Sequence, residues 1–298
     1  MAQKDIKSRI ASVKNIQKIT RAMEMVAAAR LRRAEERIEH LRPYAGAIRR
    51  MTRQAAEASE NMPRLPILQQ HEREENIGLL VVTGDRGLAG AFNSQILRAG
   101  LRSAAGHHHE HRSVRWYASG RRGVSSLTFR SIDLAGSYVG FTDRPGYANA
   151  REIAGDLMSA FVDGEVDRVD IFYNGYISPL TQEVRQETLL PLQEASILEE
   201  GTPEEDADQP GHSALVEYEP DPEEILRRLI PDYVEISVFR ALLESTASEH
   251  GARMTAMRSA SDNAGELIED LTLQANRARQ AEITQEIMEV VAGAEALG

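Results

Sequence analysis

Apolar residues near the start of the chain recur at a spacing typical of a coiled coil. From Ile6 to Ile48, steps that alternate between three and four residues meet an apolar side chain at 12 of 13 positions. Such steps follow the repeat of supercoiled helices, about 3.5 residues, rather than the 3.6 of a helix on a globular core. Only Pro43 interrupts the pattern, so we expect a kink or a short break there before the helix resumes toward Ala58.

A second helical repeat, at the end of the chain, could pair with the first. Residues 232–298 contain no proline, and similar steps from Phe239 to Ala292 meet an apolar residue at 11 of 16 positions. Small residues such as Ala260 and Ala264 would let two helix backbones approach closely. An unbroken helix of about 60 residues would extend roughly 90 Å, which is more than one globular domain needs. We therefore expect the two ends of the chain to pair as long helices.

The pattern changes between these helical segments. The expected strands are 77–83, 114–118 and 168–174, and the expected helices are 90–103 and 147–161. Strands that alternate with helices predict an α/β domain with a mainly parallel sheet. We divide the chain into a helical segment 1–60, an α/β domain 75–220 and a second helical segment 221–298. The acidic stretch 199–212 contains Pro and Gly, so we expect it to be a mobile loop.

Charge is distributed unevenly along the chain. Residues 1–53 hold 14 Lys and Arg against 5 Asp and Glu, so this arm carries +9 and the remainder −20. A basic arm suggests an acidic partner, which could be nucleic acid, anionic lipid or an acidic protein surface. Nucleic acid is the partner to test first. Two observations weaken it: residues 1–43 contain no Phe, Tyr or Trp to stack on bases, and apolar residues at helical spacing occupy the other face of the arm.

Composition excludes several classes of protein. The 298 residues include no cysteine, which excludes a disulfide framework, a thiolate metal site and a cysteine nucleophile. No apolar run approaches the roughly 18 residues that cross a bilayer, and the polar start lacks the apolar core of a secretory signal. We expect a soluble or peripheral protein.

Two sequence features could support chemistry, and both have a simpler interpretation. Gly84, Gly87 and Gly90 follow an expected strand, but their spacing fits neither the dinucleotide fingerprint nor the phosphate-binding loop. We predict a structural turn there. The histidine tract at 107–111 could bind a metal adventitiously, yet consecutive residues do not provide a fixed ligand geometry, so we predict a solvated loop. No grouping of serine, histidine and carboxylate stands out.

Six segments closely resemble the gamma subunit of F-type ATP synthases. They are IKSRIASVKNIQKITRAMEMVAAAR (6–30), VVTGDRGLAGAFN (81–93), YNGYISPLTQEV (173–184), MRSASDNAGELI (257–268), NRARQAEIT (276–284) and ITQEIMEVVAGAEA (283–296). The resemblance implies a long antiparallel coiled coil of the terminal helices inside a ring of alternating alpha and beta subunits. It also implies a Rossmann-like domain on the membrane-embedded c-ring, beside the epsilon subunit.

In that family this subunit is a rotating central shaft with no cofactor or metal, and catalysis belongs to the beta subunits. The resemblance also implies a peripheral location on the cytoplasmic face of the bacterial plasma membrane and no nucleic-acid partner. The alternatives are a nucleotide-dependent α/β enzyme that dimerises through coiled-coil arms and a nucleic-acid-binding protein that uses the basic arm.

The resemblance assigns partner contacts to particular residues. Met23 resembles the position that faces an acidic loop of the beta subunit. Basic residues of the same helix would attract acidic segments of the beta subunits: Lys18, Arg21, Arg30, Arg32 and Arg33. Arg279 and Gln280 resemble the pair that engages a loop of the beta subunit, and Arg253, Thr284 and Glu286 fall at positions of the same coupling interface. The last apolar residues would run in an apolar sleeve of the ring: Ile287, Val290 and Val291.

Overall fold

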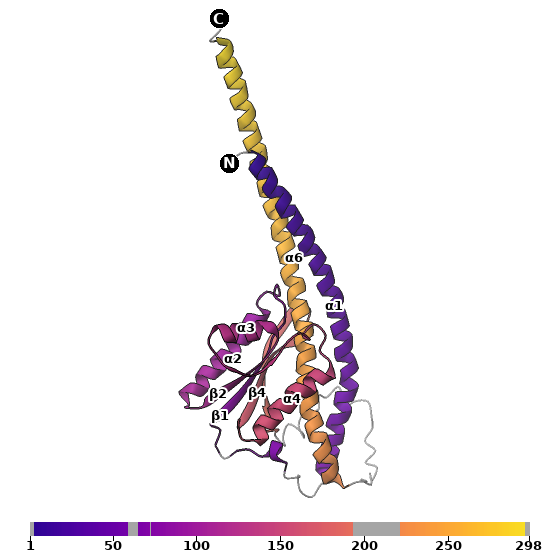
Figure 1. The fold of residues 1–298 in the computed structure, drawn as a ribbon. Helices are drawn as coiled ribbons and strands as arrows, with labels where there is room; N and C mark the ends of the chain where they lie inside the picture. Colours follow the sequence, from indigo (N-terminus) through magenta and orange to yellow (C-terminus); the bar gives the residue numbers. More distant parts are fainter. Residues whose placement is uncertain (1–2, 59–64, 72, 193–220, 296–298) are drawn as a thin grey trace. The chain divides into compact units, whose positions relative to one another are not determined.

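The computed structural model describes residues 3–58, 65–71, 73–192 and 221–295 (Figure 1). The helices are α1 (Gln3–Ala58), a 3-10 helix η1 (Pro66–Leu68), α2 (Phe92–His109), α3 (Arg121–Phe129), α4 (Tyr147–Val162) and α6 (Pro222–Glu295). The strands are β1 (Asn76–Val82), β2 (Ser113–Ser119), β3 (Leu134–Tyr138), β4 (Arg168–Ser178) and β5 (Thr181–Leu190). The chain divides into two compact units: residues 1–29 with 253–298, and residues 30–252.

The first unit is an antiparallel pair formed by the two ends of the chain. Ile6 is buried in one cluster with Leu271 and Ala275. Further along α1, the Nε of Arg258 donates a hydrogen bond to Glu24, at 2.9 Å. Contacts therefore move down α6 as they move up α1, which confirms the prediction of paired, antiparallel terminal helices.

Along part of α6, the residues that face α1 are shifted by one position from the predicted ones. Ser261 is buried where Ala260 was expected, and Leu267 is 47% exposed where a seam residue was expected. The backbone carbonyl of Ser261 accepts a hydrogen bond from Gln17 Nε2, at 3.3 Å. Gln17 thus faces the partner helix, while the neighbouring Ile16 is 53% exposed. Alternating steps of three and four residues admit either phase, and the partner side chains decide which one forms.

The proline within α1 does not break that helix. α1 runs through Pro43 without interruption. Ala45 and Ile48, one turn later, are buried in a cluster with Leu229 and Ile236 of α6. A proline inside a helix costs about 3 kcal/mol. Burial of apolar side chains on the helix that follows offsets this cost, so the expected break is absent.

The second unit contains a five-stranded sheet in the order β3-β2-β1-β4-β5. Strand β1 pairs in parallel with β2 and with β4, and β2 pairs in parallel with β3. Only β5 is antiparallel, and it pairs with β4. This arrangement confirms the predicted α/β, mainly parallel sheet. Sequence patterns did not predict α3 or β3, because α3 is short and β3 is a half-buried edge strand containing Gly136.

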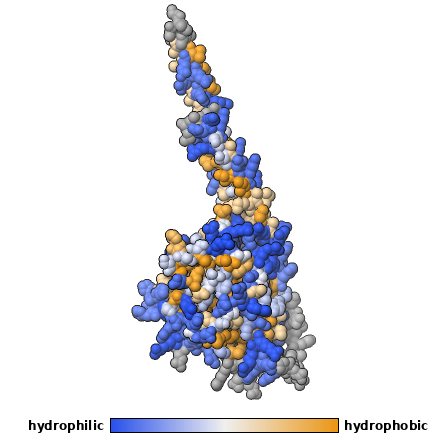
Figure 2. All heavy atoms as spheres, in the orientation of Figure 1, coloured by the Kyte–Doolittle hydropathy of each residue, from blue (hydrophilic) through white to orange (hydrophobic). Residues whose placement is uncertain are grey.

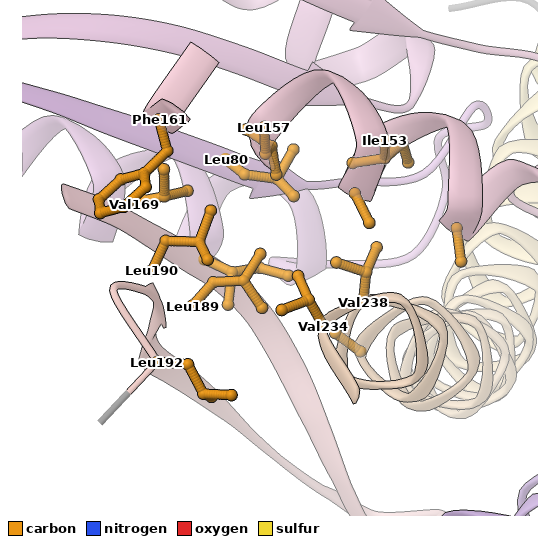
Figure 3. Packing of buried hydrophobic residues seen from close by; sticks show 14 of the residues in the cluster. Leu80, Ile153, Leu157, Phe161, Val169, Leu189, Leu190, Leu192, Val234 and Val238 are labelled. Carbon is orange, nitrogen blue, oxygen red and sulfur yellow. The ribbon is translucent and has the colours of Figure 1, made fainter. Parts of the chain in front are cut away.

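Both faces of the sheet are covered, and β1 supplies side chains to each in alternation. Leu79 and Val81 belong to the core beneath α2 and α3. Leu80 and Val82 point to the opposite face, which α4 and α6 cover (Figure 1). Figure 3 shows this second core, in which side chains of β1, α4, β4, β5 and α6 meet. Burial on both faces explains why β1 reads as a continuous apolar run.

The histidine tract at 107–111 and the acidic stretch 199–212 were both predicted to be loops. The histidine tract was predicted to be a solvated loop, but His107, His108 and His109 form the last turn of α2. This prediction was wrong because the apolar face of α2 extends to Ala104, so the helix continues past it. The acidic stretch 199–212 lies outside the described residues.

Among the helices of the described ranges, none combines the length and apolar character that crossing a bilayer requires.

Candidate functional site

The glycine-rich turn after β1 is tied together by one carboxylate. Asp85 accepts hydrogen bonds from the backbone N–H groups of Arg121 and Gly140, both at 2.9 Å, and of Thr142, at 3.2 Å. Burial alone would raise the pKa of Asp85, but these N–H donors outweigh it and lower the pKa. The N-terminus of α3, a place where phosphates often bind, is therefore capped from within the chain.

The first glycine of the turn allows α6 to pack closely. A Cβ on Gly84 would lie 2.6 Å from the carboxyl carbon of Glu249, which is buried on α6. The backbone N–H of Gly84 donates to Asn93 Oδ1 at the start of α2, at 2.8 Å. The turn joins β1, α2 and α6, and this geometry supports the prediction of a structural turn.

Two ion pairs anchor α6 on the antiparallel edge of the sheet. Arg240 Nη2 lies 2.7 Å from a carboxylate oxygen of Glu187 on β5, and Arg185 Nη1 lies 3.2 Å from Glu244. Tyr173 on β4 also donates to Glu187, at 2.5 Å. Burial raises the pKa of Glu244, although Arg240 and Arg185 oppose this effect. These contacts fix α6 against the sheet within the second unit.

The basic residues of α1 differ in exposure. Lys18 and Arg21 in the first unit are exposed. Met23 is half-buried in the same helix. In the second unit, Arg32 and Arg33 are exposed too. These four basic side chains therefore place positive charge at the surface of α1.

Arg30 has an acidic neighbour within the second unit. Its Nη1 lies 2.9 Å from Oδ2 of Asp143, in the loop after β3. The same oxygen lies 3.3 Å from Arg86 Nη2. Asp143 was missed by the sequence analysis, because a single carboxylate in an irregular loop carries no periodic signal. Arg30 is therefore less available to a partner than Arg32.

Arg253 is the first residue of α6 that belongs to the first unit. Its side chain is buried, and 7% of its surface is exposed. It was predicted at a partner interface, and within this chain it takes part in an interaction. Its burial leaves little of this side chain accessible on the surface of the chain.

The last turns of α6 expose the remaining predicted contact residues. All are exposed: Arg279, Gln280, Thr284, Glu286, Ile287, Val290 and Val291. The cluster around Ile6 reaches only as far as Ala278 on α6. Figure 2 shows apolar residues among hydrophilic ones near the C-terminal end, and Val290 is 73% exposed.

Side-chain bonds in this region are local. The hydroxyl of Thr284 donates to the backbone carbonyl of Gln280, at 2.8 Å, and Gln285 Nε2 donates to Glu289 Oε1, at 2.9 Å. Gln280 and Thr284 are one turn apart on one face of the helix. A helix that exposes apolar and polar side chains together offers a surface for a partner.

No group of three or more metal-ligating side chains comes together within residues 3–58, 65–71, 73–192 and 221–295.

Comparison with known proteins identifies the family. Residues 2–297 match the family described as ATP synthase. The ATP synthase gamma chain of Rubrobacter xylanophilus is 46% identical over 294 residues, which cover 99% of this chain and 98% of that protein. The ATP synthase gamma chain of Streptomyces avermitilis is 43% identical over 295 residues, covering 98% and 94%.

Solved structures agree with this family. The chain matches one from the central stalk and c-ring of Tetrahymena thermophila mitochondrial ATP synthase with a TM-score of 0.60 and 27% identity, over 82% of this chain and 99% of that one. A chain of the Euglena gracilis mitochondrial ATP synthase matches in fold, with a TM-score of 0.65 and 16% identity, over 99% and 94%. The chain therefore belongs to the ATP synthase gamma-chain family.

Proposed function

We infer that this chain couples rotation of a proton-driven c-ring to conformational cycling of the catalytic beta subunits in ATP synthesis. Its role as a rotor subunit, not itself catalytic, follows from the family. The observation that carries the proposal is the antiparallel pairing of the chain's two ends, with Ile6 against Leu271 and Ala275. Two helices wound together transmit torque better than one. We propose that segments 1–60 and 221–298 act as the shaft and 75–220 as its foot.

Such a shaft couples rotation to catalysis because it binds the surrounding subunits with different strength at each angle. An asymmetric helix pair makes different contacts with three chemically identical neighbours, so each angle favours a different set of open and closed nucleotide sites. The effect is reciprocal at equilibrium, because nucleotide occupancy biases the angle as much as the angle biases occupancy. The partners are the alpha and beta subunits, epsilon and the c-ring. The complex is membrane-associated, and we propose that this chain lies on the cytoplasmic face of the bacterial plasma membrane.

The exposed end of α6 is our first candidate for the contact with the beta subunits. Arg279 and Gln280 offer a guanidinium and an amide beyond the last residue that packs with Ile6. Thr284 lies one turn further on, and Glu286 adds a carboxylate. We propose that this polar face engages a loop of the beta subunit. The exposed Ile287, Val290 and Val291 would bury their apolar surface in the surrounding ring.

The basic face of α1 is the second candidate. Lys18, Arg21 and Arg32 are exposed, so they can attract acidic segments of the beta subunits at long range. Exposed charges of this kind hold no single geometry tightly, which suits a surface that must pass three neighbours in turn. Arg30 and Arg33 extend the face, and Met23 adds a half-buried apolar contact. Buried Arg253 would act by fixing the helix surface that a partner meets.

The double substitution Arg279→Ala with Gln280→Ala tests the proposal in the reconstituted complex. We expect lower coupled ATP turnover with the fold intact, since both side chains are exposed. The matched control is Gln95→Ala with Arg98→Ala, an exposed glutamine and arginine on α2. Unchanged turnover in a properly assembled complex would exclude the proposed contacts.

Two measurements separate this function from the alternatives raised by the sequence. Co-purification with alpha and beta subunits is expected for a gamma subunit, and neither an enzyme with dimerisation arms nor a nucleic-acid-binding protein would give it. The isolated chain is expected to hydrolyse no ATP. Salt-dependent binding to duplex DNA that competes with assembly would favour the nucleic-acid alternative instead.

A further inference from the structure

A cavity of about 180 Å³ in the second unit is lined by a cluster of arginines together with polar and apolar side chains. It lies between α1, the loop after β3 and α6. Four arginines and one carboxylate take part in its lining: Arg30, Arg33, Arg37, Arg144 and Asp143.

Most of these guanidinium groups have no carboxylate to neutralise them. Asp143 is shared by Arg30 and Arg86, which lie on the same oxygen. Within the described part of the chain, Arg33 and Arg144 form no ion pair. Arg37 donates from Nη2 to the backbone carbonyl of Pro145, an uncharged acceptor. At least three positive charges around the cavity therefore lack a counter-ion.

The position of Arg37 is fixed by the chain and not by attraction to an acid. Burial lowers the pKa of Arg37, and the nearby charge of Arg144 lowers it further. Arg144 is exposed, so water screens this repulsion in part. An anion placed between the two side chains would relieve it, and the planar fork of arginine matches the oxygens of a phosphate group.

A second cleft adjoins the first and has a different character. It has a volume of about 480 Å³ and shares Arg37 and Leu243 with the basic cavity. Its wall includes three aromatic side chains, those of Tyr44, Tyr147 and Phe239, beside two leucines. The Tyr147 and Phe239 rings meet edge to face, with centroids 5.7 Å apart, while Tyr44 is 49% exposed. Clefts of about 300–1,000 Å³ lined in this way are typical of small-molecule sites.

We propose that the two adjoining cavities form one site for an organic phosphate that carries a flat ring, such as a nucleoside monophosphate. The phosphate group lies between Arg37 and Arg144, and Arg33 adds long-range attraction. The ring lies in the aromatic cleft against Tyr44 and Phe239. This site lies away from the coupling contacts of α6, although it shares Arg33 with the basic face of α1. It would let a phosphorylated metabolite act on the junction of α1 with the α/β domain.

Calorimetric titration of the purified full-length chain at low salt tests this site with three probes: AMP, adenosine and inorganic phosphate. We expect AMP to bind at least tenfold more tightly than either fragment, because only AMP occupies both cavities. Added salt should weaken AMP binding, since charge dominates at the phosphate end. AMP affinity no better than that of the fragments would overturn the proposal.

Three variants assign the contacts. Arg37→Gln with Arg144→Gln should weaken AMP at least tenfold, and Tyr44→Ala should weaken AMP while leaving inorganic phosphate unchanged. The control is Arg42→Gln, an exposed arginine of the same helix that lines neither cavity, and it should bind AMP normally. Melting temperatures confirm that each variant folds. Wild-type AMP affinity in the folded double variant, or equal loss in Arg42→Gln, would show that the site is not as described.

Discussion

The Nε of Arg258 donates a hydrogen bond to Oε1 of Glu24 across 2.9 Å, although 234 residues separate them along the chain. The bond crosses from α6 to α1 within the first unit. It lies further up α1 than the apolar cluster at Ile6. An apolar contact at one end and a polar contact further along fix the register of the helix pair.

A double-mutant cycle on Glu24→Ala and Arg258→Ala should give a small coupling energy. The Arg258 side chain is more than half exposed, so we expect about 0.2–1 kcal/mol, decreasing as salt rises. Thermal unfolding of the wild type, both single variants and the double variant measures this energy. A coupling of zero at low salt would mean that the pair does not stabilise the helices.

Replacing Gly120 with alanine should destabilise the α/β domain strongly. Gly120 has φ +91°, and a Cβ there would lie 2.1 Å from the backbone oxygen of Thr83. Neither the conformation nor the space allows a side chain. Gly155 within α4 is the matched control, because its Cβ would meet nothing within 4 Å.

Gly155→Ala should leave stability unchanged or raise it by up to about 1 kcal/mol, through higher helix propensity. Urea denaturation monitored by circular dichroism compares the two variants. Equal stability of Gly120→Ala and the wild type would contradict the close approach of Thr83.

Leu157→Ala should cost about 2–5 kcal/mol of unfolding free energy. Leu157 of α4 is completely buried and lies in the core between the sheet and α6 (Figure 3). Truncation leaves a cavity that surrounding side chains fill only in part. Leu273→Ala is the control, since Leu273 is 51% exposed and should lose less than about 0.5 kcal/mol. Denaturant titration of both variants measures these losses of unfolding free energy, and equal losses would contradict the burial of Leu157.

Asp85→Asn should destabilise the chain by about 1–3 kcal/mol near neutral pH, because a charged acceptor of several N–H donors is lost. The folded-state pKa of Asp85 is lowered, so its ionised form contributes stability above the unfolded pKa of about 3.9. That contribution disappears as pH falls through the lowered, folded-state pKa.

The stability gap between wild type and Asp85→Asn should therefore narrow in acid. Denaturation curves at about pH 7 and about pH 3 measure this gap. The two pH values lie on either side of the unfolded-state pKa of Asp, about 3.9. A gap that is constant across this range would show that the carboxylate charge is not what holds the turn.

Local sequence patterns predicted the elements that repeat over many residues. Apolar residues from Ile6 to Ile48 follow the repeat of a paired helix, and the strand at β1 is a continuous apolar run. Such signals accumulate along the chain, because each turn of helix and each pair of strand residues adds to them. α3 and β3 gave no comparable signal, since each is short and only partly buried.

The amino-acid sequence by itself determined that the two ends are long helices and that an α/β domain lies between them, because these depend on short-range periodicity. Only the tertiary structure decided that Ser261 rather than Ala260 faces α1, and that the helix continues past Pro43. It also decided that Asp143 joins Arg30 and Arg86. These outcomes depend on side chains that are distant in sequence, and the free energy of packing them together exceeds the local preferences that periodicity records.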